Sequence, residues 1–183
     1  PPPPKPGEGV CELNRAEMLR TSSFYALWFC YFIACLAGLM AIGIVTNVGD
    51  ELSVKSVLAL APAGFFAIFN GGGRPVFGSL TDRLKPRNTA LISFALIAAA
   101  SLLMWQVPTE PVYILAFALL WGCLGGWLAI APTACASYFG TCDYPRCYGV
   151  LFLAYGGGAL AALYPVFMSQ TSVTGSLLGV FPY

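Results

Sequence analysis

The sequence "NGGGRPVFGSLTDRLKPR", residues 70–87, passes from an apolar, glycine-rich segment into a polar one. Its polar end carries Arg83, Lys85 and Arg87, as expected where a membrane span meets water. Arg74 differs from them because it stands inside the apolar part, where a charge costs about 2.5–3.5 kcal/mol on insertion scales. The stretch therefore predicts the end of a membrane helix that carries one buried cation, and that cation needs a partner.

The composition of the whole chain is that of a membrane protein rather than a soluble domain. Hydrophobic residues make up 58% of the 183 residues and charged residues 9%, against about 25% charge in soluble domains. A membrane span needs about 20 apolar residues. By this measure the sequence holds five complete spans and the truncated start of a sixth. They are predicted at 24–46, 54–80, 89–106, 111–138 and 147–168, with the last beginning near 175.

Basic residues fall on alternate sides of these spans. They occur before the first span, after the second and after the fourth: Lys5, Arg15, Arg20, Arg83, Lys85, Arg87 and Arg146. The other side holds Lys55 beside Asp50 and Glu51. Because Lys and Arg mark the cytoplasmic side, the N-terminal segment and these two loops are predicted to lie inside. We expect a multi-pass protein of a plasma or inner membrane.

The two ends of the chain are unlike its middle. The start, "PPPPKPGEGVCELNRAEMLRT", has no apolar core after a basic start, so it is not expected to be a signal peptide. It is predicted to be a proline-rich linker followed by a short polar helix. The chain shows no initiator methionine and ends within an apolar run, "SLLGVFPY", so we expect a fragment of a longer protein.

Several classes of function find no support in the residues. The net charge of +1 argues against a nucleic-acid partner, and the absence of histidine removes the commonest metal ligand and general base. Cys142 and Cys147 are spaced C-x4-C without a second pair, so no zinc site is predicted. The glycine run lacks the G-K-[ST] of a phosphate-binding loop, and the sequence offers no catalytic cluster. No enzyme activity, metal or cofactor is therefore predicted.

Arg74 should face a cavity or a neighbouring helix rather than lipid. On a helix its side is small or polar, whereas the opposite side carries Phe65, Phe69 and Val76. One interpretation is that Arg74 extends to the inner interface or pairs with an acidic residue elsewhere in the protein. The other is an anion site, in which the guanidinium holds a carboxylate by two parallel hydrogen bonds. No Asp or Glu lies at mid-span in this chain, which favours an anion that arrives from solution.

The loop "GSLTDRLKPR", residues 78–87, resembles the cytoplasmic loop signature of the major facilitator superfamily, G-x-L-x-D-R-x-G-R-[KR]. The matching positions are Gly78, Leu80, Asp82, Arg83 and Arg87. Lys85 stands where the signature has glycine, and Pro86 is also atypical. Three blocks, "EMLRTSSFYALWFCYFIACLAGLMAIG", "FNGGGRPVFGSLTDR" and "SYFGTCDYPRCYGVLFLAYGGGALAALYP", look in this order like the C-terminal half of an oxalate/formate antiporter-type transporter.

This resemblance implies an all-α, polytopic membrane helix bundle. Residues 1–22 would end the central cytoplasmic loop, and residues 23–183 would be helices seven to eleven and a truncated start of twelve. The bundle would work with a missing N-terminal six-helix half in a lipid bilayer. The implied function is secondary active transport of a small organic anion, by exchange or proton symport, through alternating access. A non-transporting sensor or truncated relative on the same scaffold is the alternative.

The resemblance also implies a set of binding residues. In the oxalate exchanger, basic residues on helices eight and eleven hold the dianion, and the first of them maps to Arg74. The basic residue on helix eleven is a lysine in a motif like "YG-x-x-[FY]-x-A-K-G". This chain has "YGVLFLAYGGGA" there, with Tyr155 in place of the lysine. A site with one cation suits a monocarboxylate, or a carboxylate with a proton, better than oxalate. Asn70 lies on the same helix face as Arg74 and is also predicted to bind substrate. Trp127 either lines the same cavity or is a packing or lipid-facing residue. Tyr155 either donates a hydrogen bond to the substrate or is a packing or interface aromatic.

A separate role follows for the loop signature. Gly78, Asp82, Arg83 and Arg87 would form a conformational latch that holds the outward-open state. The same charges would also hold the loop inside, and both roles can apply.

Overall fold

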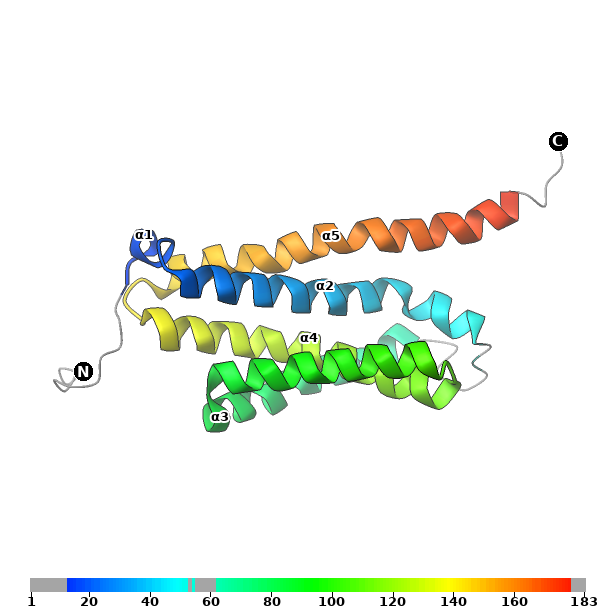
Figure 1. Cartoon of the computed structure of the whole chain (residues 1–183), viewed down its shortest axis with the longest axis horizontal. Helices are drawn as coiled ribbons and strands as arrows, with labels where there is room; N and C mark the ends of the chain where they lie inside the picture. Colours follow the sequence, from blue (N-terminus) through cyan, green and yellow to red (C-terminus); the bar gives the residue numbers. More distant parts are fainter. Residues whose placement is uncertain (1–12, 53, 55–61, 179–183) are drawn as a thin grey trace.

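The apolar blocks of the sequence form long helices. The computed structural model describes residues 13–52, 54 and 62–178, with side chains described as far as Phe167. In chain order its elements are α1 (Arg15–Met18), α2 (Ser22–Glu51), α3 (Pro62–Gln106), α4 (Glu110–Phe139) and α5 (Tyr144–Leu178). The long helices lie side by side, with α1 at one end (Figure 1). The predicted all-α bundle is confirmed, whereas the proline-rich linker lies outside the described residues.

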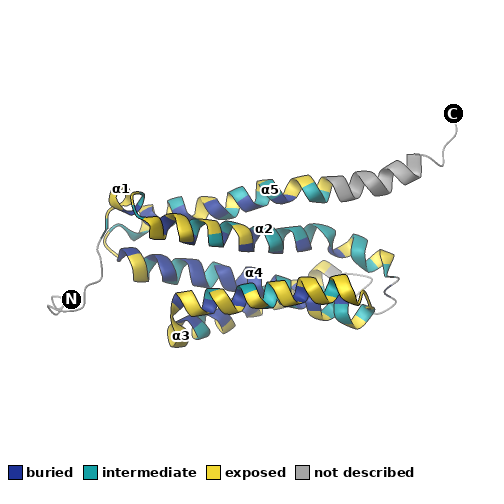
Figure 2. Ribbon diagram, viewed as in Figure 1, coloured by how far each residue is buried: buried dark blue, intermediate teal, exposed yellow. Residues whose placement is uncertain are grey.

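Four of the described helices are long and apolar enough to cross a membrane: Ser22–Glu51, Ala63–Gln106, Glu110–Phe139 and Tyr144–Phe167. Their outer faces are exposed (Figure 2), and many of the exposed side chains are large and apolar. Trp105 is 81% exposed, Leu160 72% and Ile68 70%. A helix that is hydrophobic all round belongs in a membrane, where lipid covers such side chains.

The helix α3 is bent at Lys85 into two antiparallel limbs, a first limb (62–84) and a second limb (86–106) (Figure 1). The first limb corresponds to the predicted span 54–80, whose residues 55–61 lie outside the described part. The second limb corresponds to the predicted span 89–106. The polar loop expected between these spans is in fact a single non-helical residue. Pro86 explains this, because it drives the preceding residue out of the helical region and itself suits the first position of a helix.

Lys85 has φ 69° and ψ 153°, which is a conformation that glycine alone adopts easily. A non-glycine residue there costs about 1–3 kcal/mol. The loop signature that this stretch resembles has glycine at this position, so the sequence departs from the signature where the backbone needs glycine most.

The helix α5 also differs from the prediction. It continues to Leu178, through the break that the sequence predicted between residues 168 and 175. Ser, Thr and Gln in this region cost only a fraction of a kcal/mol each, up to about 0.7, within a helix. The predicted start of a sixth span near 175 falls on the end of this helix and on residues 179–183, which lie outside the described part, and it stays a prediction.

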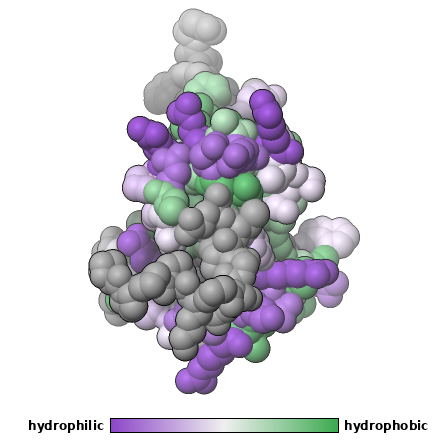
Figure 3. Space-filling model, turned by 90° about the vertical axis from the view of Figure 1, so that its left-hand side faces the viewer, coloured by the Kyte–Doolittle hydropathy of each residue, from purple (hydrophilic) through white to green (hydrophobic). Residues whose placement is uncertain are grey.

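The basic residues gather at one end of the bundle. The start of α2, the bend of α3 and the α4–α5 connection all lie at this end, here called the basic end (Figure 1). Figure 3 views the bundle from this side and shows hydrophilic side chains around it. The short helix α1 is fastened there, because Leu13 N donates to Phe139 O at 2.9 Å and Arg15 N donates to Asp143 Oδ2 at 3.2 Å. The described parts of the three segments that the sequence predicted on one side of the membrane thus lie at one end of the bundle.

Candidate anion site

Arg74 and Tyr155 lie at the same depth in the bundle. Arg74 precedes the bend at Lys85 by eleven residues, which is about 16 Å of helix. Tyr155 follows the start of α5 at Tyr144 by eleven residues, again about 16 Å. Both counts begin at the basic end, so both residues lie about the same distance from it, and this distance is about half of the roughly 30 Å that a membrane span covers.

The structure places these two predicted site residues within electrostatic range of each other. The side chain of Tyr155 on α5 is half-buried. Arg74 itself is exposed. Within the described residues no carboxylate forms an ion pair with it, and the ion pair found there joins Arg146 to Asp143 at the basic end, at 3.7 Å. The guanidinium is thus open to an anion from solution.

Arg74 is held in place by an unusually close crossing of α3 and α4. A side chain on Gly73 would collide with the carbonyl of Gly122, and one on Gly125 would collide with the carbonyl of Asn70. Only glycine permits such an approach of two helix backbones. The Asn70 side chain adds a hydrogen bond across the crossing, from Nδ2 to the Trp121 carbonyl at 3.3 Å. Asn70 therefore contacts α4 one helical turn from Arg74.

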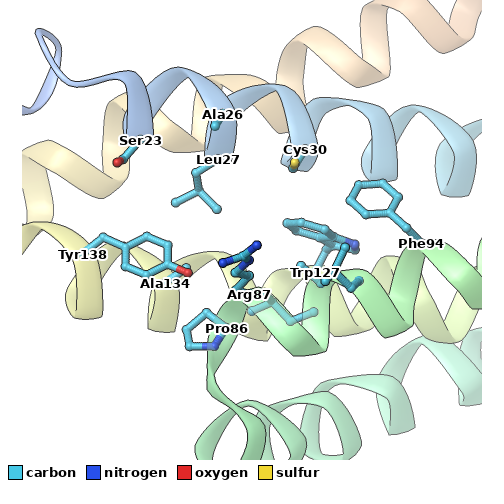
Figure 4. Close-up of a pocket in the computed structure, with 13 residues that line it drawn as sticks. Ser23, Ala26, Leu27, Cys30, Pro86, Arg87, Phe94, Trp127, Ala134 and Tyr138 are labelled. Carbon is cyan, nitrogen blue, oxygen red and sulfur yellow. The ribbon is translucent and has the colours of Figure 1, made fainter.

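Trp127 lies elsewhere in the core. It is fully buried, and its Nε1 donates to Ser93 Oγ at 3.0 Å. Its ring stacks on Tyr31 at 6.0 Å and packs against Phe94 at 5.4 Å. It contributes to a cavity of about 340 Å³ between α2, α4 and the second limb of α3 (Figure 4), which neither Arg74 nor Tyr155 lines. This geometry supports the packing interpretation of Trp127 that the sequence left open.

The residues of the predicted latch surround the bend of α3. Asp82 and Arg83 are exposed at the end of the first limb, and Gly78 is half-buried one turn earlier. Arg87 follows the bend, and its side chain reaches into the cavity of Figure 4. In the described part of the chain no ion pair joins Asp82 to either arginine. The latch remains a prediction.

An aromatic ladder along α5 and a tyrosine behind it were not predicted as part of the site. Tyr144, Tyr148, Phe152 and Tyr155 follow one another along one side of α5, with neighbouring ring centroids 5.7, 5.8 and 5.3 Å apart. Tyr31 of α2 packs against this ladder, with its ring 6.4 Å from that of Phe152. The spacing of the α5 aromatics was visible in the sequence, but no local pattern pointed to Tyr31.

These observations define a polytopic α-helical membrane protein with a cation inside a membrane-length helix. The model of the Major Facilitator Superfamily matches residues 3–181, and the chain belongs to this superfamily of transporters. It is 28% identical over 160 residues to the oxalate:formate antiporter of Oxalobacter formigenes, covering 83% of this chain and 38% of that protein. It is also 28% identical over 162 residues to the MFS-type transporter YhjX of Escherichia coli (strain K12), covering 85% and 40%. The chain thus spans about 40% of the length of the curated relatives it matches.

Proposed function

We propose that this chain is part of a secondary active transporter that moves a small monocarboxylate by alternating access, through exchange or proton symport. The observation that carries the proposal is the guanidinium of Arg74, which stands within a membrane-length helix, forms no ion pair with a described residue and lies within electrostatic range of Tyr155. A charge inside a membrane is costly, and a bound carboxylate would neutralise it. A second helical half and the bilayer would complete the cavity around it.

The single cation favours a monocarboxylate over a dianion such as oxalate. Arg74 can hold one carboxylate by two parallel hydrogen bonds, and the Tyr155 hydroxyl can donate another. A second carboxylate would remain uncompensated in a medium of low dielectric constant, which is costly. Although one relative is an oxalate:formate antiporter by name, this residue difference makes formate-like or lactate-like anions the better fit.

In this proposal the basic end faces the cytoplasm, because Lys and Arg mark that side. Gly78, Asp82, Arg83 and Arg87 would act there as the latch of the transport cycle. Asn70 would act by fixing the crossing of α3 and α4, and so the position of Arg74.

Uptake of labelled formate, lactate, pyruvate and oxalate into liposomes tests the proposal, with protein expressed from the complete reading frame. The wild type is expected to favour the three monocarboxylates over oxalate. Tyr155→Lys adds a second cation at the same depth, so it should shift the preference for oxalate over lactate by at least about tenfold, since a hydrogen bond to a charged group contributes about 1.5–3 kcal/mol.

Tyr155→Phe is the matched control, because it removes the hydroxyl and adds no charge. It should weaken lactate uptake without improving oxalate uptake. If the wild type moved none of the four anions, the proposed function would be wrong. If Tyr155→Lys left the preference unchanged, Tyr155 would not belong to the site.

A further inference from the structure

Tyr31 of α2 is a fully buried residue with a polar hydroxyl, and it packs behind the ladder on α5. Its side chain is 0% exposed, and its ring is fixed by stacking on Trp127 at 6.0 Å with an angle of 17°. No hydrogen bond of standard geometry satisfies its hydroxyl among the described residues. Burying a hydroxyl without a hydrogen bond costs about 1–3 kcal/mol, so this hydroxyl would gain from a partner close to it.

The Tyr31 side chain packs against the ladder on α5, where its ring centroid lies 6.4 Å from that of Phe152. The hydroxyls of Tyr31 and Tyr148 are close enough to interact, and Tyr155 lies within electrostatic range of Tyr31. Tyr148 in turn is half-buried, with its ring stacked on Tyr144 at 5.7 Å and 2°. Tyr31 is therefore the fixed group, and Tyr148 is the group that its hydroxyl can orient.

Tyr148 occupies a defined place between Arg74 and the basic end. It precedes Tyr155 by seven residues, which is about 10 Å of helix toward that end. Between them stands Phe152, which is 41% exposed, so this side of α5 is open along the ladder. An anion that travels between the basic end and Arg74 along this face passes Tyr148 first.

We propose that the Tyr148 hydroxyl forms a second binding position for the transported carboxylate, on the basic-end side of Arg74, and that Tyr31 is a positioning residue that orients this hydroxyl. This inference rests on the proposed function. A neutral phenol donates one hydrogen bond to a carboxylate oxygen and adds no charge, so it binds the anion weakly enough to release it toward Arg74 or toward solution.

The test is the KM for lactate on each side of the membrane, measured in proteoliposomes of one orientation with protein from the complete reading frame. Tyr148→Phe keeps the ring and removes the donor. It should raise the KM on the basic-end side about tenfold and leave the KM on the opposite side within about twofold. Tyr31→Phe should give the same one-sided change, because it acts through Tyr148.

A double variant that combines Tyr31→Phe with Tyr148→Phe tests whether Tyr31 acts through Tyr148 or independently of it. If Tyr31 acts through Tyr148, the double variant should be no worse than Tyr148→Phe alone, since coupled residues are not additive. Tyr164→Phe is the control, because Tyr164 is on the same helix and 69% exposed, and it should change neither KM.

Four results would overturn this inference. If Tyr148→Phe changed the KM equally on both sides of the membrane, or changed it on neither side, the second binding position would not exist. Additive effects in the double variant would remove the positioning role of Tyr31. If the wild type transported no carboxylate, the proposed function would be wrong as well. If the wild type transported lactate but the variants behaved otherwise than expected, only the roles of Tyr148 and Tyr31 would be wrong.

Discussion

Replacing Arg74 with alanine is expected to reduce carboxylate uptake at least about 100-fold, because two hydrogen bonds to a charged group contribute about 1.5–3 kcal/mol each. Insertion and folding should persist, since Arg74 is exposed and forms no ion pair within the described residues. Removing the charge also removes its insertion cost. The measurement is the initial rate of labelled lactate uptake at matched amounts of protein in liposomes.

Arg74→Lys is the informative partner variant. It keeps the charge but loses the planar fork that holds both carboxylate oxygens, so an intermediate rate is expected. Arg146→Ala serves as a control, because Arg146 pairs with Asp143 at the basic end, away from the site. Lactate uptake by Arg74→Ala within twofold of the wild type would show that this arginine does not hold the substrate.

The second large effect is expected at Gly73. A methyl group there would collide with the Gly122 backbone, which cannot rotate away as a side chain can. We expect Gly73→Ala to force α3 and α4 apart, to destabilise the protein by at least about 1–3 kcal/mol, and to lower uptake by displacing Arg74. Thermal unfolding in detergent and lactate uptake measure the two consequences.

The neighbouring glycine provides a matched control. A Cβ on Gly72 would meet nothing within 4 Å, although it stands in the same helix one residue away. Gly72→Ala should therefore be neutral or stabilise the helix by about 0.5–1 kcal/mol. If the two variants unfolded at the same temperature, the close crossing of α3 and α4 would not exist in the folded protein.

Hydropathy and charge predicted the bundle well, because both depend on composition over many residues. The apolar blocks became α2 to α5, and the alternate basic segments came together at one end. The bend of α3 was not predicted as such, because a charged residue such as Lys85 suggests a loop, whereas its dihedral angles depend on Pro86. Likewise, α5 continues past residue 168, where the predicted span ended.

The candidate site was predicted only in part. Arg74 was evident because a lone charge in an apolar span is conspicuous in any sequence. Its proximity to Tyr155 depends on how α3 and α5 are placed, and the sequence alone suggested it only through a family resemblance. Tyr31 and the Gly73–Gly122 contact are tertiary features, since each joins helices far apart in the chain.

The most direct test of the account compares a carboxylate with its neutral amide. Unlabelled lactate and lactamide have nearly the same size and shape, but only lactate offers the negative charge that Arg74 requires. We expect unlabelled lactate to inhibit the uptake of labelled lactate by the wild type. Lactamide should not inhibit this uptake even at a concentration about 100-fold higher than that of the unlabelled lactate. Equal competition by the two compounds would contradict a carboxylate held by Arg74.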